Sequence, residues 1–379
     1  MLKPLFKYAG GKYNECRFFA HLIPETIRNY YEPFAGSAGV YLYLRDKGVI
    51  TGQTVLSDVS FDLINFYRCV ADKTVASHLR LINDGWKQLA EVAAKIYDKF
   101  GTDFEAYITD KPNGYTLESI QAYLEELLPQ MNMTIAKYAD FRVFKMPVFI
   151  AKSLFDKAKR FKKKTITSNH ETIISDCIYT AIYQGFYFCI RDMYNDFRVN
   201  KNHVKYSSEV VAAHWLFLRE MCFGSMYRFN PNNGKFNVPY GGKSYNSKTF
   251  DEKIKQYTST EVVDAFAAEK DVHLELMDYK EAIDLLGAPG PDDFIFLDPP
   301  YDSTFSAYDG NSFGRDKHTE LANKLKTVGC KWMMVIKNTE FIYGLYAGWA
   351  KIASFDKTYS YQARGSYDKD VEHLIITNY

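Results

Sequence analysis

The chain has 379 residues, of which 47% are hydrophobic and 25% charged, and its formal net charge at pH 7 is +1. This balance excludes a disordered chain, and the length is sufficient for a large core in two or three domains. Because the net charge is close to zero, any nucleic-acid partner would have to be bound by a local cluster of Lys and Arg.

Simple sequence features bear on localisation and redox state. No run of 18 apolar residues is present, and the first residues lack the apolar stretch and cleavage site of a signal peptide. We therefore expect a cytoplasmic protein without a transmembrane helix. The cysteines are far apart and form no C-x-x-C pair, which predicts buried thiols and no metal site. They are Cys16, Cys69, Cys177, Cys189, Cys222 and Cys330.

The first 70 residues predict alternating strands and helices. Residues 31–44 indicate a short strand, a loop of small residues and an amphipathic helix. Residues 54–58 predict a second short strand, and residues 62–70 place apolar side chains at helical spacing. This order predicts a parallel sheet flanked by helices.

From about residue 72 to 222 the pattern changes to helices alone. The segments with helical periodicity are 78–100, 118–128 and 176–195. A Lys-rich run at 157–164 is either a solvated helix face or a basic patch for nucleic acid. Residues 224–245 are rich in Asn, Gly, Pro and aromatic side chains, which predicts a loop or a twisted hairpin.

The strand–helix alternation resumes after this loop. The predicted elements are strands at 272–276 and 294–297, a helix at 319–327, and strands at 332–336 and 372–379. The predicted fold class is α/β, with one sheet built from two separate parts of the chain. We expect a discontinuous sheet domain, residues 1–71 and 250–379, and an inserted, mostly helical domain, residues 72–249.

The sequence Asp298-Pro299-Pro300-Tyr301 ends the apolar strand 294–297 at a rigid, polar corner. Each proline fixes its own φ and lacks an N–H, so the corner has few conformations and cannot extend the sheet. A carboxylate, backbone carbonyl groups and an aromatic ring are therefore held at the carboxyl end of a strand, where ligands bind in open α/β sheets. The alternative is a proline turn in which the tyrosine only packs.

Three acids, Asp58, Asp278 and Asp298, end predicted strands. Acids at this edge of a nucleotide-binding sheet commonly bind ribose hydroxyls and amino groups. Asp58 lies about 20 residues beyond the small-residue loop 34–39, which is the spacing of a ribose-binding acid. The loop lacks the G-x-G-x-x-G pattern that binds pyrophosphate, so it fits a smaller, uncharged linkage. For Asp58 and Asp278 the alternative is an N-cap of the following helix.

Six segments along the chain form one ordered set. They are 7–12 (KYAGGK), 32–39 (EPFAGSAG), 56–67 (LSDVSFDLINFY), 227–230 (YRFN) with 234–241 (GKFNVPYG), 298–301 (DPPY), and Arg364 with 372–379. In this order they resemble the Dam-type DNA adenine-N6 methyltransferases (D12 class, alpha group), a family in which the target-recognition region lies between the glycine loop and the Asp-Pro-Pro-Tyr motif. They cover both ends of the chain, whereas residues 72–222 match no segment of the family.

The resemblance implies a Rossmann-like sheet that uses S-adenosylmethionine, with an inserted target-recognition domain, residues 72–249, and a β-hairpin at 224–245. Lys12 would pair with the methionine carboxylate, and Asp58 would accept hydrogen bonds from the ribose. Asp278 and Tyr279 would flank the adenine. The full set implied for the cofactor is Tyr8, Lys12, Phe34, Gly36, Asp58, Asp278, Tyr279 and Asp298.

The resemblance assigns catalysis to Asp298, Pro299, Pro300 and Tyr301. The lone pair of adenine N6 is delocalised into the ring, so the nitrogen is a poor nucleophile. Asp298 and the carbonyl of Pro299 can accept both N6–H bonds, which frees the lone pair and stabilises the developing positive charge. Tyr301 can stack on a base that has been flipped from the duplex. Direct displacement needs no covalent intermediate, so no catalytic cysteine is expected.

The hairpin corresponds to the loop with which the family reads the duplex. Phe229 would insert as an apolar wedge beside Asn230, and Arg228 and Lys235 would contact phosphates or bases. The set implied for DNA is Arg228, Phe229, Asn230, Lys235, Asn237 and Pro239. The alternative is a surface loop with a packed Phe236.

Two other functions stay open. One is methylation of RNA or of cytosine N4, although cytosine enzymes more often have Ser in place of the motif's Asp. The other is a catalytically silent DNA-binding relative; its support is Ala38, which stands where the family's F-x-G-x-G pattern has a second glycine. By analogy we expect GATC as the target, double-stranded DNA as the partner, a monomer or weak dimer, and a nucleoid-associated or phage-encoded protein in a bacterial host.

Overall fold

The computed structural model describes residues 1–8, 10–131, 133, 145–162, 170–200, 206–285, 290–302, 313–358 and 370–379. The chain divides into two compact units, which we call the sheet unit (1–72 and 259–379) and the helical unit (73–258). The predicted boundary at 249 lies ahead of α9 (Asp251–Thr258), which belongs to the helical unit. The amide of Asn83 explains this, because it accepts from the backbone N–H of Phe250 (2.8 Å) and donates to Asp251 (2.9 Å).

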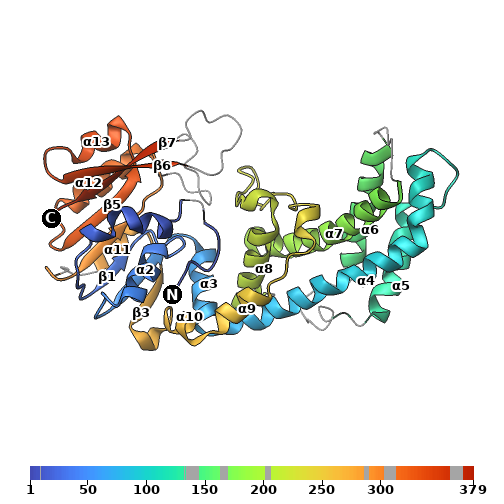
Figure 1. Ribbon diagram of the computed structural model, residues 1–379, viewed down its shortest axis with the longest axis horizontal. Coiled ribbons are helices and arrows are strands. Elements are labelled where there is room, and N and C mark those ends of the chain that lie inside the picture. Colours follow the sequence, from blue (N-terminus) through green and yellow to red (C-terminus); the bar gives the residue numbers. More distant parts are fainter. Residues whose placement is uncertain are drawn as a thin grey trace. The chain divides into compact units, whose positions relative to one another are not determined.

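One seven-stranded sheet forms the centre of the sheet unit (Figure 1). Its strand order is β3-β2-β1-β4-β5-β7-β6. The first five strands are parallel, and β7 is antiparallel to both of its neighbours. Their bounds are β1 (Tyr30–Glu32), β2 (Thr54–Asp58), β3 (Val272–Leu276), β4 (Phe294–Leu297), β5 (Lys331–Lys337), β6 (Lys351–Thr358) and β7 (Asp370–Thr377).

The strand order reverses between β1 and β4. From β1 the chain goes outward to β2 and β3, whereas β4 lies on the other side of β1 and is followed by β5. In open α/β sheets such a switch point leaves a crevice at the carboxyl ends of the two strands, because their connections leave in opposite directions. The glycine loop follows β1 and the Asp-Pro-Pro-Tyr corner follows β4, so this topology brings the two motifs together.

Helices cover both faces of the sheet. Strand β4 is buried along its whole length, as its unbroken apolar sequence predicts. Phe296 stacks on Phe19 of α1 (centroids 5.7 Å), while Ile295 and Leu297 join the core on the opposite face. The described helices of this unit are α1 (Cys16–Phe19), α2 (Gly39–Lys47), α3 (Phe61–Ala71), α10 (Thr260–Asp264), α11 (Tyr279–Leu285), α12 (Arg315–Leu325) and α13 (Glu340–Tyr346).

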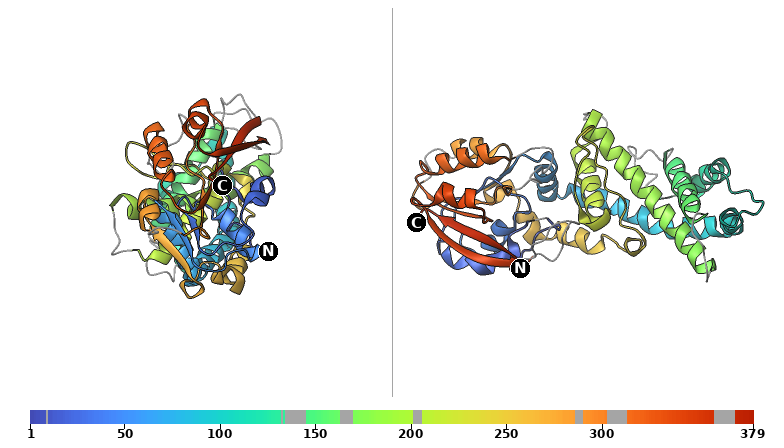
Figure 2. Two further views of the ribbon diagram at one scale, coloured as in Figure 1. Left: turned by 90° about the vertical axis from the view of Figure 1, so that its left-hand side faces the viewer. Right: turned by 90° about the horizontal axis from the view of Figure 1, so that it is seen from above.

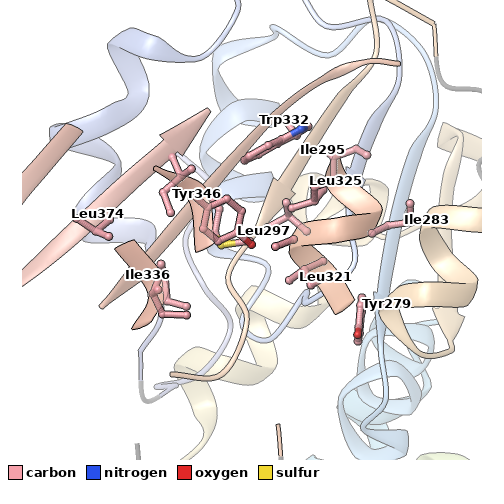
Figure 3. Packing of buried hydrophobic residues seen from close by; sticks show 14 of the residues in the cluster. Tyr279, Ile283, Ile295, Leu297, Leu321, Leu325, Trp332, Ile336, Tyr346 and Leu374 are labelled. Atoms are coloured by element: carbon pink, nitrogen blue, oxygen red, sulfur yellow. The ribbon is translucent and has the colours of Figure 1, made fainter. Parts of the chain in front are cut away.

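The main core of the sheet unit lies between strands β4, β5 and β7 and helices α11, α12 and α13 (Figure 3). Trp332 on β5 is fully buried and packs edge-on against Tyr346 of α13 (6.2 Å). Leu321 and Leu325 extend from α12 into the same cluster. Burying side chains of this size stabilises the fold by roughly 1.5–3 kcal/mol each. This core therefore supports β4 just before the Asp-Pro-Pro-Tyr corner.

The helical unit is built on long helices that pack against one another (Figure 2). Helix α7 contacts α4, α6 and α8, and Gly185 allows the close approach of α6, because a Cβ there would lie 2.5 Å from the Cα of Ile150. By length and composition α7 could cross a membrane, but 67% of its most apolar stretch is buried, as in a core helix. The bounds are α4 (Thr74–Ile108), α5 (Leu117–Gln130), α6 (Met146–Lys162), α7 (His170–Asn200) and α8 (Ser208–Met221).

The predicted α/β class with a helical insertion is confirmed. Strands predicted at 54–58, 272–276 and 294–297 have those bounds in the structure. Strand β6 and helix α13 were not predicted. Strand β6 lies at the edge of the sheet and mixes Lys, Ser and Asp with apolar residues. It therefore lacks the apolar run by which a buried strand is predicted.

Candidate functional site

The corner after β4 contains a partly buried ion pair. The Nζ of Lys12 lies 2.6 Å from Oδ1 of Asp298, and the Lys12 side chain is 2% exposed. The same ammonium donates to the carbonyl of Gly10 (3.1 Å) and to the hydroxyl of Tyr301 (3.1 Å). An ammonium has three N–H groups, and here each has an acceptor. The N-terminal segment is thereby tied to both polar side chains of the Asp-Pro-Pro-Tyr motif.

This pairing bears on the predicted role of Lys12. We expected its ammonium to bind a ligand carboxylate, and the structure instead shows it on the carboxylate of Asp298. Sequence reasoning did not foresee this contact, because the two residues are separated by 286 positions. A ligand carboxylate would have to replace one of the three acceptors that Lys12 now has.

The glycine loop is held by its own peptide groups. The N–H of Gly36 donates to Oδ2 of Asp58 (3.0 Å), and its carbonyl accepts from the hydroxyl of Tyr67 (2.7 Å). Gly36 has a φ of +46°, and a Cβ there would lie 3.1 Å from the ring of Tyr8. Only glycine permits this close approach at low cost. Tyr8 of the first segment therefore lies close to the glycine loop.

Asp58 has a structural role at the carboxyl end of β2. Its Oδ1 accepts from the N–H of Ser60 (2.9 Å) just before α3, and its Oδ2 holds the glycine loop. Asp278 acts similarly, because its Oδ1 accepts from the N–H of Lys280 (3.0 Å) in the first turn of α11. The alternative prediction of an N-cap is therefore confirmed for Asp278, which directly precedes α11, and is wrong for Asp58, because the N-cap of α3 is Ser60.

Ala38, the departure from the family pattern, has a left-handed conformation (φ 51°, ψ 32°) and is fully buried. This region is the one in which glycine is favoured. Gly39 is needed for a different reason, because a Cβ there would lie 3.0 Å from the backbone nitrogen of Tyr13. The loop therefore keeps its turn with alanine at the left-handed position and glycine at the crowded one.

Phe34 and Tyr279 pack together, with ring centroids 5.4 Å apart and nearly parallel planes. Tyr279 is 2% exposed and belongs to the core cluster, and its hydroxyl donates to the carbonyl of Lys317 (3.4 Å). Burial raises the pKa of its phenol. The buried ring of Tyr279 thus packs against one face of Phe34, whose own ring stays partly exposed to solvent.

Sequence reasoning missed an apolar surface beside Asp58. Val59 is 47% exposed and Leu276 is 45% exposed, and Leu276 is the register partner of Asp58 across β2 and β3. Phe61 is 37% exposed in the next turn of the chain. The sequence could have indicated this surface, because the apolar residues Val59 and Phe61 follow Asp58 almost directly. Exposed apolar side chains around a carboxylate suit a ligand that has a ring and hydroxyl groups.

The predicted hairpin at 224–245 contains an isolated antiparallel bridge between Phe229 and Phe236, and a second bridge joins Tyr240 to Cys222 just before it. Between residues 235 and 240 the side chains alternate between exposed and buried. The buried ones are Phe236, Val238 and Tyr240; the exposed ones are Lys235, Asn237 and Pro239. The three predicted DNA-contacting residues of this segment therefore lie on its outer face.

Helix α7 holds this segment through its backbone. The amide of Asn195 donates to the carbonyl of Phe236 (3.0 Å) and accepts from its N–H (2.7 Å). Arg191 (3.2 Å) and the hydroxyl of Tyr187 (2.9 Å) both donate to the carbonyl of Val238. Tyr187, Arg191 and Asn195 are four residues apart, so they lie on one face of the helix. These side chains of α7 therefore hold the backbone of the segment between its two isolated bridges.

At the start of the hairpin, Arg228 is exposed and Asn230 accepts from Gly234 through its carbonyl (2.8 Å). Phe229 is partly covered, because the guanidinium of Arg198 lies 3.6 Å from its ring centroid and Tyr227 packs edge-on at 5.2 Å. A more exposed aromatic, Phe223 (49%), lies in the 3-10 helix η5 (Phe223–Ser225). Phe223 was not among the predicted DNA-contacting residues.

The described lysines of the Lys-rich run lie on α6 and contact neighbouring side chains of the helical unit. Lys159 lies 4.4 Å above the ring of Phe155, and Lys162 pairs with Asp110 and lies 5.0 Å above a tyrosine ring. Burial lowers the pKa of Lys157. These contacts within the protein favour the prediction of a helix face over that of a basic patch for nucleic acid. Residues 163 and 164 of the run, like Ala9 and Arg364 of the family segments, lie outside the described residues.

Other chemistry is not indicated in the described parts of the chain. The six cysteines are buried and unbonded to one another, and burial raises the pKa of Cys16 to about 12. A thiol with so high a pKa is a poor nucleophile at neutral pH. Within the described ranges, no group of three or more His, Cys, Asp or Glu side chains is arranged to hold a metal ion.

Comparison with known proteins identifies the family. The family model for D12 class N6 adenine-specific DNA methyltransferases matches residues 8–361. The Type II methyltransferase M.CviBI of Paramecium bursaria Chlorella virus NC1A is 31% identical over 381 residues, covering 100% of both chains. M.MjaIII of Methanocaldococcus jannaschii is 24% identical over 393 residues, covering 100% of this chain and 99% of that protein. The Retron Ec67 DNA adenine methylase of Escherichia coli is 28% identical over 154 residues, 38% of this chain and 49% of that protein. The chain therefore belongs to the D12 class of N6 adenine-specific DNA methyltransferases.

Proposed function

We propose that the protein transfers a methyl group from S-adenosylmethionine to N6 of an adenine that has been flipped out of duplex DNA. The observation that carries this proposal is the cluster of Lys12, Asp298 and Tyr301 at the end of β4, next to the strand-order reversal. Family membership supports adenine in DNA as the acceptor.

The residues around the glycine loop fit the proposed methyl donor. Gly36 has no Cβ where one would crowd Tyr8, so the backbone can approach a ligand closely. Asp58 offers carboxylate oxygens for ribose hydroxyls, and the exposed side chains of Val59 and Leu276 offer an apolar surface for a purine. S-adenosylmethionine bound there would supply an electrophilic methyl group on a sulfonium.

Asp298 and Pro299 carry the proposed catalytic step. A carboxylate has about four lone-pair positions, so Asp298 can accept an adenine N6–H while it stays paired with Lys12. The Pro299 carbonyl accepts the second N6–H, which directs the nitrogen lone pair out of the ring plane. Because both acceptors are fixed before the base arrives, the developing positive charge is stabilised with little reorganisation. Tyr301 stacks on the base and keeps it in this position.

The helical unit carries the proposed recognition of the duplex. The outward-facing Lys235, Asn237 and Pro239 lie on a segment whose backbone is held by α7, and Arg228 is exposed nearby. A rigid backbone with free side chains on one face suits the reading of base edges and phosphates. Phe229 is the proposed wedge, and its insertion requires the Arg198 guanidinium to leave its ring.

Transfer of a tritiated methyl group from S-adenosylmethionine tests the proposal. Unmethylated duplex DNA, single-stranded RNA and a duplex without adenine are offered in parallel. We expect incorporation only into the adenine-containing duplex. Label in RNA or in the adenine-free duplex would favour another acceptor. Donor binding without incorporation into any substrate would favour a silent DNA-binding relative.

A further inference from the structure

The hydroxyl of Tyr301 has a second side-chain neighbour besides Lys12. Nε2 of His373, on β7, lies 3.3 Å from the Tyr301 oxygen, and the two rings pack edge-on with centroids 5.7 Å apart. His373 is fully buried, with 0% of its surface exposed. A buried histidine on a distant strand therefore contacts the ring that faces the proposed target base.

The direction of this contact depends on which ring nitrogen of His373 carries the proton. The Lys12 ammonium can only donate, so the Tyr301 oxygen accepts from it (3.1 Å). The phenol has one proton of its own, and Nε2 of a neutral His373 with its proton on Nδ1 can accept it. A protonated His373 would place a second cation against the same phenol oxygen. The neutral ring is thus the form that completes the Lys12–Tyr301–His373 chain.

The His373 ring is itself held firmly. Phe355 on β6 stacks on it (5.5 Å, 20°), and Phe18 of α1 stacks on the other side of Phe355 (4.8 Å, 16°). Phe355 and Lys337 are the register partners of His373 on its two neighbouring strands. Both antiparallel strands at the edge of the sheet therefore help to orient one imidazole toward the catalytic corner.

We propose that His373 is a positioning residue, which fixes the direction of the Tyr301 side chain by accepting a hydrogen bond from its hydroxyl. Rotation about the Cα–Cβ bond of Tyr301 would break the hydrogen bonds of its oxygen with both Lys12 and His373, so two partners hold the hydroxyl end of the ring before the base enters. The inference rests on the proposed function, in which Tyr301 stacks on the flipped adenine. It gives His373, inside the family segment 372–379, a positioning role that the resemblance assigned to none of that segment's residues.

A double-mutant cycle on the full-length protein tests the proposal. His373→Phe keeps a ring that can stack on Phe355 but removes the acceptor, and Tyr301→Phe removes the hydroxyl. We expect His373→Phe to lower kcat about tenfold while KM for S-adenosylmethionine stays within about twofold. Added to Tyr301→Phe, it should have no further effect. His373→Gln, which can place an amide oxygen near the position of Nε2, should recover most of the activity.

The control is His273→Phe, which changes a strand histidine on β3 at the opposite side of the sheet and should leave kcat unchanged. Parental kcat in His373→Phe, or an equal loss in the parental and Tyr301→Phe backgrounds, would overturn the proposal. If His373→Phe does not fold, as judged by melting and donor binding, Tyr301→Phe alone decides, because parental kcat there shows that the hydroxyl is not needed. A parent protein without methyl transfer refutes the proposed function, whereas an active parent with additive variants refutes only the role of His373.

Discussion

The two units of this protein place functional groups in different ways. In the sheet unit, polar side chains stand at the ends of short buried strands, and contacts between distant segments, such as Lys12 with Asp298, hold them together. In the helical unit, α7 binds the backbone of an extended segment and leaves its alternate side chains exposed. The difference suits the proposed tasks, because catalysis needs fixed reacting groups and recognition needs side chains that face outward.

Buried ionisable groups show a second difference between the units. Glu32 in the sheet unit is 3% exposed, and burial raises its pKa from 4.5 to about 8. His214 in the helical unit is 1% exposed, and burial lowers its pKa from 6.5 to about 3. Both groups are neutral in the folded protein near pH 7. Burial of Glu32 therefore makes the sheet unit less stable as pH rises, and burial of His214 makes the helical unit less stable as pH falls.

The largest effect is expected for Asp298→Ala, which should affect the chemistry of the sheet unit alone. Loss of the N6–H acceptor should lower kcat by at least about a thousandfold, while DNA affinity stays parental. Asp298→Asn, which keeps an acceptor for the buried Lys12, should be equally inactive with a smaller loss of melting temperature. Asp284→Ala, an exposed acid on α11, is the control. Near-parental turnover in Asp298→Ala would contradict the assigned role.

Asn195→Ala should affect the helical unit alone. The change leaves a buried N–H and a buried carbonyl of Phe236 without their partner, which costs about 2–3 kcal/mol. We expect lower stability of this unit by hydrogen exchange and a higher KM for DNA, with donor affinity unchanged. The matched control is Asn200→Ala, at an exposed position of the same helix. A parental KM for DNA would show that the α7 contacts do not organise recognition.

Phe229→Ala should weaken base flipping or site discrimination more than donor affinity. Removal of an inserted aromatic is expected to lower flipping of a 2-aminopurine placed at the target by about tenfold. Phe223→Ala is compared in parallel, because Phe223 is the more exposed aromatic of the loop. Equal activity on all adenine contexts before and after the Phe229 change would count against the wedge. A larger effect at Phe223 would transfer the role to that residue.

Glu32→Gln should change how stability depends on pH. Because the folded pKa is raised, the native state holds a proton that the unfolded state has lost between pH 4.5 and about 8. The free energy of unfolding should therefore fall with rising pH in this window by about 1.4 kcal/mol per pH unit from this group. The variant should lack this slope in urea unfolding at pH 5 to 8. An identical slope in both proteins would show that Glu32 does not titrate as described.

The smallest effect is expected for Ala38→Gly. Glycine relieves the left-handed strain of about 1–2 kcal/mol but removes a buried methyl group worth about 0.8 kcal/mol. The net change in stability should be about 1 kcal/mol or less, with kcat within about twofold of the parent. Ala38→Val should be strongly destabilising, because a β-branched residue rarely adopts this conformation. A large gain of activity in Ala38→Gly would show that Ala38 impairs the parent enzyme.

Much of the sheet unit was predictable because its signals are local. An unbroken apolar run that ends in Asp-Pro-Pro defines β4 and its corner, and the acid that closes 54–58 defines the end of β2. The family was predictable for the same reason, since its motifs are short and occur in a fixed order. In the helical unit, apolar periodicity located parts of α4, α5 and α7 but not their full lengths.

The contacts that complete the site were not predictable, because they join residues far apart in the chain. No local pattern shows that Lys12 pairs with Asp298, that His373 reaches Tyr301, or that Asn195 holds Phe236. These pairs depend on the sheet order and on the packing of α7. Tyr279 illustrates the same limit, since its position after β3 suggested a ligand contact and the fold buries it behind Phe34.

The most direct test is nucleoside mass spectrometry of DNA from a methylation-deficient bacterial host that expresses the protein. The account predicts N6-methyladenine, confined by sequencing to one sequence context, and its loss in the Asp298→Ala variant. Unmodified adenine in the presence of folded protein, or N4-methylcytosine in place of N6-methyladenine, would contradict it.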